Sequence, residues 1–221
     1  MRHAVFVTGG TGYIGSRLIP ALHARGHFVQ ALVCRGSEHK LPGGCAAIVG
    51  NALDASTFVR QIAPADVFVH LVGVAHSSPT KAEAFKRIDL VSVQQAVRAA
   101  KENNIAHVVY LSVAHPAPIM KQYIAVRMEA ERLIRESGMS ATFVRPWYVL
   151  GPGHRWAYTL KPFSWLAERV PALREQALRL GLVTLGQLVS ALVRAVEHPP
   201  PHMRVIEAQE IRSAPSLGIQ A

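Results

Sequence analysis

The feature that most constrains this sequence is a glycine-rich turn close to its amino terminus. Residues 4–8 (AVFVT) form a short apolar run that predicts a buried strand, and an apolar stripe at helical spacing begins at Ile14. Between them the chain reads GGTGYIG, in which three glycines have the spacing G-x-x-G-x-x-G: Gly9, Gly12 and Gly15. The order is therefore strand, glycine-rich turn and helix.

This order predicts an anion-binding site, because the first N–H groups of a helix lack partners within the helix and lie at the positive end of its dipole. One glycine permits the tight turn, one lets the backbone approach a pyrophosphate, and one lets helix and strand pack closely. We expect six residues to contact a dinucleotide here: Thr8, Gly9, Gly12, Tyr13, Ile14 and Gly15. The alternative is a glycine-rich turn that binds nothing.

Composition narrows the classes of partner. The chain has 221 residues, half of them hydrophobic, which is enough for one large α/β domain with a substantial core. Its net charge of +10 would suit nucleic acid or an anionic membrane, but the basic residues are scattered and form no basic tail. We therefore expect a basic surface without a specific nucleic-acid partner. Cys34 and Cys45 stand in no metal-ligand spacing, so no metal site is predicted.

The sequence also indicates the cellular compartment. No apolar stretch reaches the ~18 residues expected of a transmembrane helix, and the apolar run at the amino terminus is too short for a signal peptide. Two isolated cysteines fit a reducing compartment. These features predict a cytoplasmic protein without a transmembrane segment.

Short apolar runs alternate with helical patterns, which is typical of a parallel sheet covered by helices on both faces. Strands are expected at residues 4–8, 27–33, 46–49, 67–72, 106–112, 142–144 and 204–208. Helices are expected at residues 13–25, 55–62, 82–103, 120–137 and 186–197. Asp54 and Asp89 are expected to be helix caps. The predicted fold class is α/β, a doubly wound parallel sheet (Rossmann fold) with a small C-terminal cap.

We expect residues 1–150 to form the dinucleotide-binding core, and residues 151–221 to add the cap and a returning helix and strand in one compact domain. Five aromatic residues gather near the start of the second part: Trp147, Tyr148, Trp156, Phe163 and Trp165. They predict either an apolar wall for a substrate or the packed interior of the cap. Ligands of such folds bind at the carboxyl ends of the strands, near the point where the strand order reverses.

Several motifs, in order along the chain, resemble those of the short-chain dehydrogenase/reductase superfamily in its extended and atypical branches. Residues 8–15 (TGGTGYIG) resemble its cofactor turn, and Ser112 follows Leu111 as in its catalytic serine strand. Tyr123 and Arg127 stand where the family has its Tyr-x-x-x-Lys pair, and residues 145–153 (RPWYVLGPG) resemble its R-P-x-x-x-x-G-P-G segment. Within that branch the chain is similar to relatives of the respiratory complex I accessory subunit and to NmrA-like regulators.

The resemblance implies a catalytic group of Tyr123, Arg127 and Ser112. Tyr123 would exchange a proton with the substrate, a nearby cation would favour its phenolate, and Ser112 would hydrogen-bond a substrate oxygen. Tyr123 and Arg127 are four residues apart, so they share one helix face. Arginine supplies the charge of the family's lysine, but its fork is larger and it keeps its proton. The alternative is an ordinary pair on a helix surface.

The resemblance also implies cofactor contacts at the strand ends. Asn51 and Ala52 lie where the family contacts adenine, and the backbone of residues 71–73 lies where it flanks the cofactor. The three members of that segment are Leu71, Val72 and Gly73. Tyr123 and Arg127 would contact the nicotinamide ribose. The segment between Pro146 and Val149 would pass under the nicotinamide.

Arg35 lies just after the second expected strand, about twenty residues beyond the glycine turn. An acidic residue there would bind the adenosine ribose hydroxyls, but the chain reads Cys-Arg-Gly-Ser. Arginine and serine suit a phosphate group, so we predict NADP(H) as the cofactor in preference to NAD(H). The alternative is that Arg35 points into solvent.

These features predict an NADP(H)-binding oxidoreductase that transfers hydride between nicotinamide and a carbonyl or hydroxyl of a small-molecule substrate, with apolar character if the aromatic cluster lines the site. Two alternatives stay open. One is a nucleotide-binding sensor or structural protein without turnover. The other is a nucleotide-sugar epimerase or dehydratase, for which the part after residue 150 is short. By analogy with the family, a homodimer through helices 82–103 and 120–137 is expected.

Overall fold

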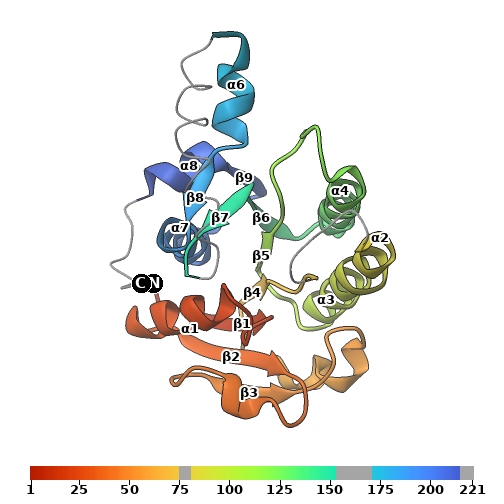
Figure 1. Ribbon diagram of the computed structural model, residues 1–221. Helices are drawn as coiled ribbons and strands as arrows, with labels where there is room; N and C mark the ends of the chain where they lie inside the picture. Colours follow the sequence, from red (N-terminus) through yellow and green to blue (C-terminus); the bar gives the residue numbers. More distant parts are fainter. Residues whose placement is uncertain (75–80, 153–170, 215–221) are drawn as a thin grey trace.

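The computed structural model describes residues 1–74, 81–152 and 171–214, and its centre is a parallel sheet of seven strands (Figure 1). The strand order is β3-β2-β1-β4-β5-β6-β9, and each neighbouring pair is parallel. The bounds are β1 Ala4–Thr8, β2 Phe28–Val33, β3 Ala46–Val49, β4 Val67–His70, β5 His107–Leu111, β6 Ser140–Arg145 and β9 Met203–Glu207. The predicted doubly wound parallel sheet is confirmed, and its order reverses between β1 and β4.

Helices cover both faces of the sheet, because the strands are apolar on both sides. The main covering helices are α1 Gly15–Ala24, α3 Val91–Glu102, α4 Lys121–Glu136 and α7 Leu185–Glu197. Val5 and Val7 of β1 pack in the core formed with α1 and α7, while Phe6 packs in the core formed with α3 and α4. This alternation fixes the register, since a slip of one residue would exchange the two faces.

The two helices on the first face begin in different ways. α7 starts with a capping box, in which the Thr184 hydroxyl accepts the Gln187 N–H at 3.2 Å and the Gln187 side chain accepts the Thr184 N–H at 2.9 Å. α1 has Ile14 as its N-cap residue, which makes no side-chain capping hydrogen bond. The sequence therefore provides side-chain partners for the amino terminus of α7 and leaves the amino terminus of α1 without a side-chain cap, available to another group.

Most predicted elements lie within two residues of the observed bounds, but two helices differ. The helix expected at 55–62 is replaced by two 3-10 turns, Ala55–Thr57 and Val59–Gln61. Pro64 limits this segment to about eight residues, which is too short for a stable α-helix. The helix expected at 82–103 is observed as α2 (Ala82–Ala84), a π-helical segment (Phe85–Leu90) and then α3.

Four short elements after residue 147 were not predicted individually, although residues 154–180 were expected to be partly helical. β7 and β8 pair in parallel as a separate sheet, α6 stands away from the main sheet in Figure 1, and α8 follows β9 directly. Their bounds are β7 Tyr148–Leu150, α6 Pro171–Arg179, β8 Leu182–Thr184 and α8 Ala208–Ser213. Such short elements leave little periodic pattern in a sequence.

The predicted cap falls only partly within the described ranges. Trp156, Phe163 and Trp165 lie outside them, so the division into core and cap stays a prediction. No helix within residues 1–74, 81–152 and 171–214 combines the length and hydropathy that crossing a membrane requires.

Candidate functional site

The spaced glycines of the turn occupy positions that a side chain would disturb. Gly9 has a φ of +79°, and a Cβ there would lie 2.9 Å from the carbonyl carbon of Leu71. A Cβ at Gly15 would lie 2.3 Å from the carbonyl oxygen of Gly9, so only glycine lets α1 begin so close to the turn. Gly12 is exposed, and its N–H donates to the Gly9 carbonyl at 3.1 Å. The turn is therefore closed tightly against β4 and α1.

The amino terminus of α1 has open hydrogen-bond donors. The Ser16 N–H donates to the Gly12 carbonyl at 2.9 Å, but within the described ranges the N–H groups of Ile14 and Gly15 donate to no backbone carbonyl. The first turn of the helix carries no acidic residue. Together with the positive end of the helix dipole, these donors fit a phosphate or pyrophosphate group.

The segment after β4 borders the turn from the other side. The Leu71 N–H donates to the Thr8 carbonyl at 3.1 Å, which continues the pairing of β4 with β1. Leu71 and Val72 are half-buried and Gly73 is exposed. A Cβ at Gly73 would lie 2.3 Å from Arg127 Nη2. This predicted cofactor-flanking segment therefore contacts the glycine turn at one end and the Arg127 guanidinium at the other.

Tyr123 and Arg127 lie on one face of α4, as their spacing predicted, and both contact the π-helical segment. The rings of Tyr123 and Phe85 have centroids 5.0 Å apart. Arg127 is buried, with Nη2 2.6 Å from Asp89 Oδ1 and its guanidinium carbon 5.1 Å from the centroid of the Tyr123 ring. Since both contacts repeat after four residues, the two helical segments meet through matched faces.

The other terminal nitrogen of Arg127 also has protein partners. Nη1 donates to the Tyr110 hydroxyl at 3.0 Å and to the Leu111 carbonyl at 3.0 Å. Burial raises the pKa of Tyr110 to about 12 against the opposing effect of the guanidinium, so Tyr110 keeps its proton at neutral pH. The predicted contact of Arg127 with a ribose stays a prediction.

The prediction that Asp89 caps a helix is wrong. Asp89 lies inside the π-helical segment, is fully buried, and accepts the Val74 N–H at 3.1 Å through Oδ2. Burial raises the pKa of its carboxyl, while Arg127 and the Val74 N–H act in the opposite direction. Asp54 does cap, because its carboxylate accepts the Ser56 N–H at 3.0 Å. The continuous helical pattern of residues 82–103 gave no sign that Asp89 turns inward.

A buried polar chain beneath the glycine turn was also not predicted. Thr8 Oγ1 lies 2.8 Å from His70 Nδ1, and His70 Nε2 lies 3.2 Å from Ser92 Oγ. Ser92 Oγ donates to the Asp89 carbonyl at 2.9 Å, so His70 donates from Nε2 and accepts at Nδ1. Burial, with Arg127 nearby, lowers the pKa of His70 to about 3 and keeps its ring neutral. The Thr8 side chain thus faces the core while its backbone leads into the turn.

Ser112 follows β5, and its side chain is buried against α4. Its hydroxyl donates to Glu131 Oε1 at 2.6 Å, and Arg145 holds the same fully buried carboxylate through Nε at 2.9 Å. Burial alone would raise the pKa of Glu131, but interactions with His115, Arg145 and Ser112 outweigh it and hold that pKa well below its usual range. The predicted contact of Ser112 with a substrate oxygen stays a prediction.

The predicted contacts after β2 and β3 lie near the surface. Arg35 is exposed in a turn whose next residue, Gly36, has a φ of +79°. Asn51 is exposed and shapes its own loop, since its side-chain oxygen accepts the Leu53 N–H at 3.0 Å. Ala52 beside it is half-buried.

The segment after β6 meets the glycine turn. The Ala114 N–H donates to the carbonyl of the buried Pro146 at 3.0 Å, and Val149 is half-buried within β7. A Cβ at Gly151 would lie 2.1 Å from the Tyr13 hydroxyl oxygen, so Tyr13 reaches across to this segment. The turn, the end of β4 and the segment after β6 therefore lie at one edge of the sheet.

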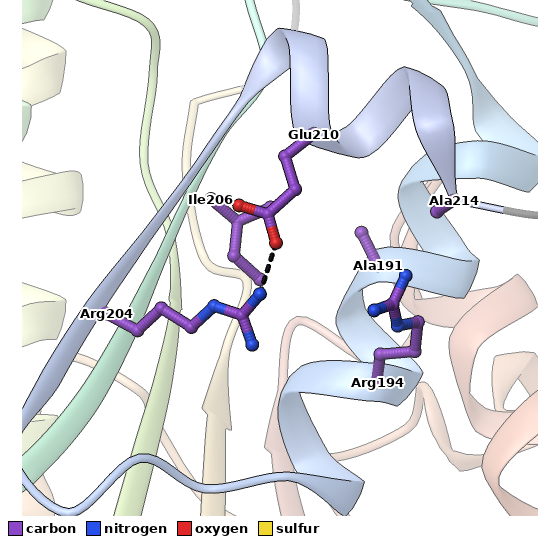
Figure 2. Close-up of a pocket in the computed structure, with 6 residues that line it drawn as sticks. All are labelled: Ala191, Arg194, Arg204, Ile206, Glu210 and Ala214. Atoms are coloured by element: carbon purple, nitrogen blue, oxygen red, sulfur yellow. Dashed lines mark hydrogen bonds and ion pairs between the residues drawn. The ribbon is translucent and has the colours of Figure 1, made fainter.

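A separate pocket lies between α7, β9 and α8, as Figure 2 shows. It is a small hollow of about 10 Å³, open to solvent, and Arg204 forms an ion pair with Glu210 inside it. The lining residues are Ala191, Arg194, Arg204, Ile206, Glu210 and Ala214. None of them belongs to the glycine turn or to α4, so this pocket is distinct from the candidate site.

Comparison with known proteins identifies the family. Residues 9–159 match a family described as NAD(P)H-binding, and the chain belongs to it. With its parallel sheet and its reductase relatives, the chain falls in the atypical branch of the short-chain dehydrogenase/reductase superfamily. The family binds pyridine nucleotides, which agrees with the predicted class of cofactor.

Two curated relatives and one solved structure illustrate the similarity. The chain is 27% identical to a ceramide reductase of Caulobacter vibrioides over 96% of this chain and 66% of that protein. It is 31% identical to the 4-hydroxy-2-methyl-3-oxo-4-farnesyl-3,4-dihydroquinoline-1-oxide ketoreductase of Stigmatella aurantiaca over 66% of this chain and 50% of that protein. The Bordetella bronchiseptica enzyme WbmH in complex with NAD+ has the same fold, with a TM-score of 0.67 and 22% identity over 92% of this chain and 75% of that one. The chain thus spans between half and two thirds of the length of the curated relatives.

Proposed function

We propose that this chain binds NADP(H) and transfers hydride between the nicotinamide and a carbonyl or hydroxyl group of a small-molecule substrate. The observation that carries the proposal is the turn between β1 and α1, where the exposed Gly12 backbone and the open N–H groups of Ile14 and Gly15 lie beside the end of β4. Ligands of doubly wound sheets bind at this reversal of strand order. Membership of the NAD(P)H-binding family supports the proposal.

Different residues around the turn would bind different parts of the dinucleotide. When bound, the reduced cofactor supplies the hydride. The open N–H groups of the turn would hold the pyrophosphate, and the backbone of residues 71–73 would flank the cofactor. Asn51 and Ala52 would contact the adenine, and the segment from Pro146 to Val149 would lie under the nicotinamide.

Tyr123 is the proposed proton donor. As hydride reaches the carbonyl carbon, the phenol would give its proton to the carbonyl oxygen, and in the reverse direction it would take that proton back. The Tyr123 ring packs against Phe85 and the Arg127 guanidinium, which limits its orientation. Ser112 would assist only by releasing the hydrogen bond that it now gives to Glu131.

NADP(H) is proposed over NAD(H) because of Arg35. This side chain is exposed after β2, at the strand end where the adenosine ribose of a dinucleotide lies in this fold. A guanidinium group binds a phosphate by charge-assisted hydrogen bonds, and no carboxylate lies between Cys34 and Ser37 to repel it. The 2′-phosphate of NADP(H) is the group it would bind.

The proposed substrate is an apolar carbonyl compound. One curated relative is named as a ceramide reductase and the other as a ketoreductase of a farnesyl-substituted dihydroquinoline oxide. Trp147 and Tyr148, which are half-buried next to Pro146, supply aromatic surface close to the proposed nicotinamide position. A homodimer is proposed on the family analogy through α3 and α4, and the outer side of α4 carries the exposed Met128.

The test is a fluorescence titration with NADPH, followed by a panel of apolar ketones, aldehydes and quinones at fixed NADPH. Gly15→Ala is expected to abolish binding, because its Cβ would lie 2.3 Å from the Gly9 carbonyl oxygen. Gly43→Ala is the matched control, since a Cβ there meets nothing within 4 Å. Absence of NADPH binding by the wild-type chain would refute the proposal. Equal binding by both variants would show that the turn is not the site.

A sensor without turnover is the second candidate. It is favoured by the buried position of Arg127, whose terminal nitrogens bind Asp89, Tyr110 and Leu111. Tight NADPH binding without oxidation on any acceptor of the panel would support this candidate over the reductase.

A further inference from the structure

We propose that Asp89 and Arg127 act as one neutral unit that positions Tyr123 and the segment 71–74, and that Arg127 does not bind the cofactor. This inference rests on the proposed function, because it assigns roles within the same site. It makes Asp89 a positioning residue and gives Arg127 the same role in place of the ribose contact expected from the sequence.

The first argument is the set of partners of the Arg127 guanidinium. Nη1 donates to the Tyr110 hydroxyl and to the Leu111 carbonyl, each at 3.0 Å, and Nη2 lies 2.6 Å from Asp89 Oδ1. Only 5% of Arg127 is exposed. A contact between Nη1 and a ribose would therefore compete with its two bonds to β5, and at Nη2 the Asp89 carboxylate already takes one of the two N–H groups.

The second argument is the position of Asp89 between two elements of the site. Its Oδ1 pairs with Arg127 on α4, and its Oδ2 accepts the Val74 N–H just beyond the end of β4. Gly73 lies against the same pair, because a Cβ there would be 2.3 Å from Arg127 Nη2 and 3.2 Å from Asp89 Oδ1. One carboxylate thus holds the proposed cofactor-flanking segment to the helix that carries Tyr123.

The third argument is the ring of Tyr123. The Arg127 guanidinium carbon lies 5.1 Å from its centroid, and Phe85 packs against the same ring. A cation over an aromatic face is attracted to the ring. Because Asp89 holds the guanidinium in place, it also holds the surface on which the Tyr123 ring packs.

The fourth argument is charge. Asp89 is fully buried and Arg127 almost so, and either one alone would be an unpaired buried ion. Removing one partner of a buried pair is strongly destabilising, whereas replacing both by uncharged groups of similar size is often tolerated. The pair should therefore behave as a coupled unit in a double-mutant cycle.

The experiment compares Asp89→Asn, Arg127→Met and the double variant with the wild-type chain. Asparagine keeps an acceptor for the Val74 N–H, and methionine keeps most of the arginine's apolar length. Thermal midpoints and NADPH dissociation constants are measured for all four proteins, and kcat and KM for the acceptor that the panel identifies.

If the inference is right, each single variant lowers the thermal midpoint by about 10 °C, and the double variant recovers much of the combined loss. The double variant binds NADPH within about threefold of the wild type, because no cofactor contact is lost. Its kcat falls about tenfold or more with little change in the KM for that acceptor, because Tyr123 loses the support of the Arg127 guanidinium.

A double variant that binds NADPH at least about tenfold more weakly would overturn the inference, since a charge-assisted bond from Arg127 to the cofactor would then be missing. Additive losses in the thermal midpoint would also overturn it. If Arg127→Met does not fold, the NADPH affinity of Asp89→Asn tests the inference. An arginine that binds the ribose would be released by this change and tighten NADPH binding, whereas the neutral unit predicts lower stability without a gain in affinity.

Ile134→Ala is the matched control on the same helix. Ile134 is buried in the core beneath α4, and its truncation lowers stability without touching Tyr123 or the segment 71–74. An equal fall in kcat in this variant would assign the effect to general destabilisation and overturn the positioning role. Failure of the wild-type chain to bind NADPH would instead refute the proposed function, and the thermal cycle would still test the pair.

Discussion

The stability of the protein is expected to fall in mild acid because of His70. This ring is fully inaccessible between Thr8 and Ser92, and burial lowers its pKa to about 3 from 6.5. The folded protein therefore keeps His70 neutral at pH 5, whereas the unfolded chain has taken up a proton there. The contribution of the neutral His70 ring to stability is fully present above pH 6.5, and it is lost as the pH falls from 6.5 towards 3.

The size of the effect follows from the shift. Each pH unit below the pKa of histidine in the unfolded chain lowers the free energy of unfolding by about 1.4 kcal/mol. The step from neutral pH to pH 5 therefore lowers it by about 2 kcal/mol through His70. This is a large part of the free energy of unfolding of a marginally stable domain. His107, whose pKa burial lowers to about 4, adds to the fall in the wild type.

The measurement is urea unfolding at pH 7.5 and pH 5.0 for the wild type, His70→Gln and Ser92→Ala. His70→Gln removes the titrating ring and leaves His107 in place, so its free energy of unfolding should fall by about 2 kcal/mol less than that of the wild type. Ser92→Ala breaks the hydrogen bond from His70 Nε2 but keeps the ring, so it should retain the wild-type pH dependence. An identical pH dependence in the wild type and His70→Gln would refute the reasoning.

Three further changes test other parts of the structure. Thr184→Ala removes the capping box of α7 and should lower the thermal midpoint by about 2–4 °C, measured by calorimetry; an unchanged midpoint would contradict this. Arg35→Ala should weaken NADPH binding about tenfold and leave NADH binding unchanged in titrations; equal weakening of both would exclude a phosphate contact. Arg127→Lys keeps a cation beside Asp89 but loses the fork, so scans should show a lower midpoint and assays no gain in reductase activity.

The fold was predictable because its signals are local and strong. Val5, Phe6 and Val7 are apolar in succession, which is what a strand buried on both faces requires. The glycines at 9 and 15 were predictable for a related reason, since each stands where backbone approaches backbone and no Cβ fits. The doubly wound order of the sheet followed from the alternation of strands and helices.

The interior of the site was less predictable, because it depends on which side chains of two helices meet. Asp89 and Glu131 are charged residues within long helical patterns, and such residues usually face solvent. One sequence signal was available for Asp89. Phe85 and Asp89 have the same four-residue spacing as Tyr123 and Arg127, which would match an aromatic and an acid to an aromatic and a base. Only the contact between the two helical segments gives that spacing its meaning.

The packing of α1 against α7 has a consequence for how the chain folds during synthesis. α1 emerges from the ribosome long before α7, since the ion pair between Arg25 and Glu197 joins residues 172 positions apart. Until α7 emerges, the apolar side of α1 around Leu18 and Leu22 has no helix to cover it. The face of the sheet that α3 and α4 cover is complete earlier in translation. The nascent chain therefore exposes the apolar surface that α7 later covers, and chaperones that bind apolar segments would act on this surface.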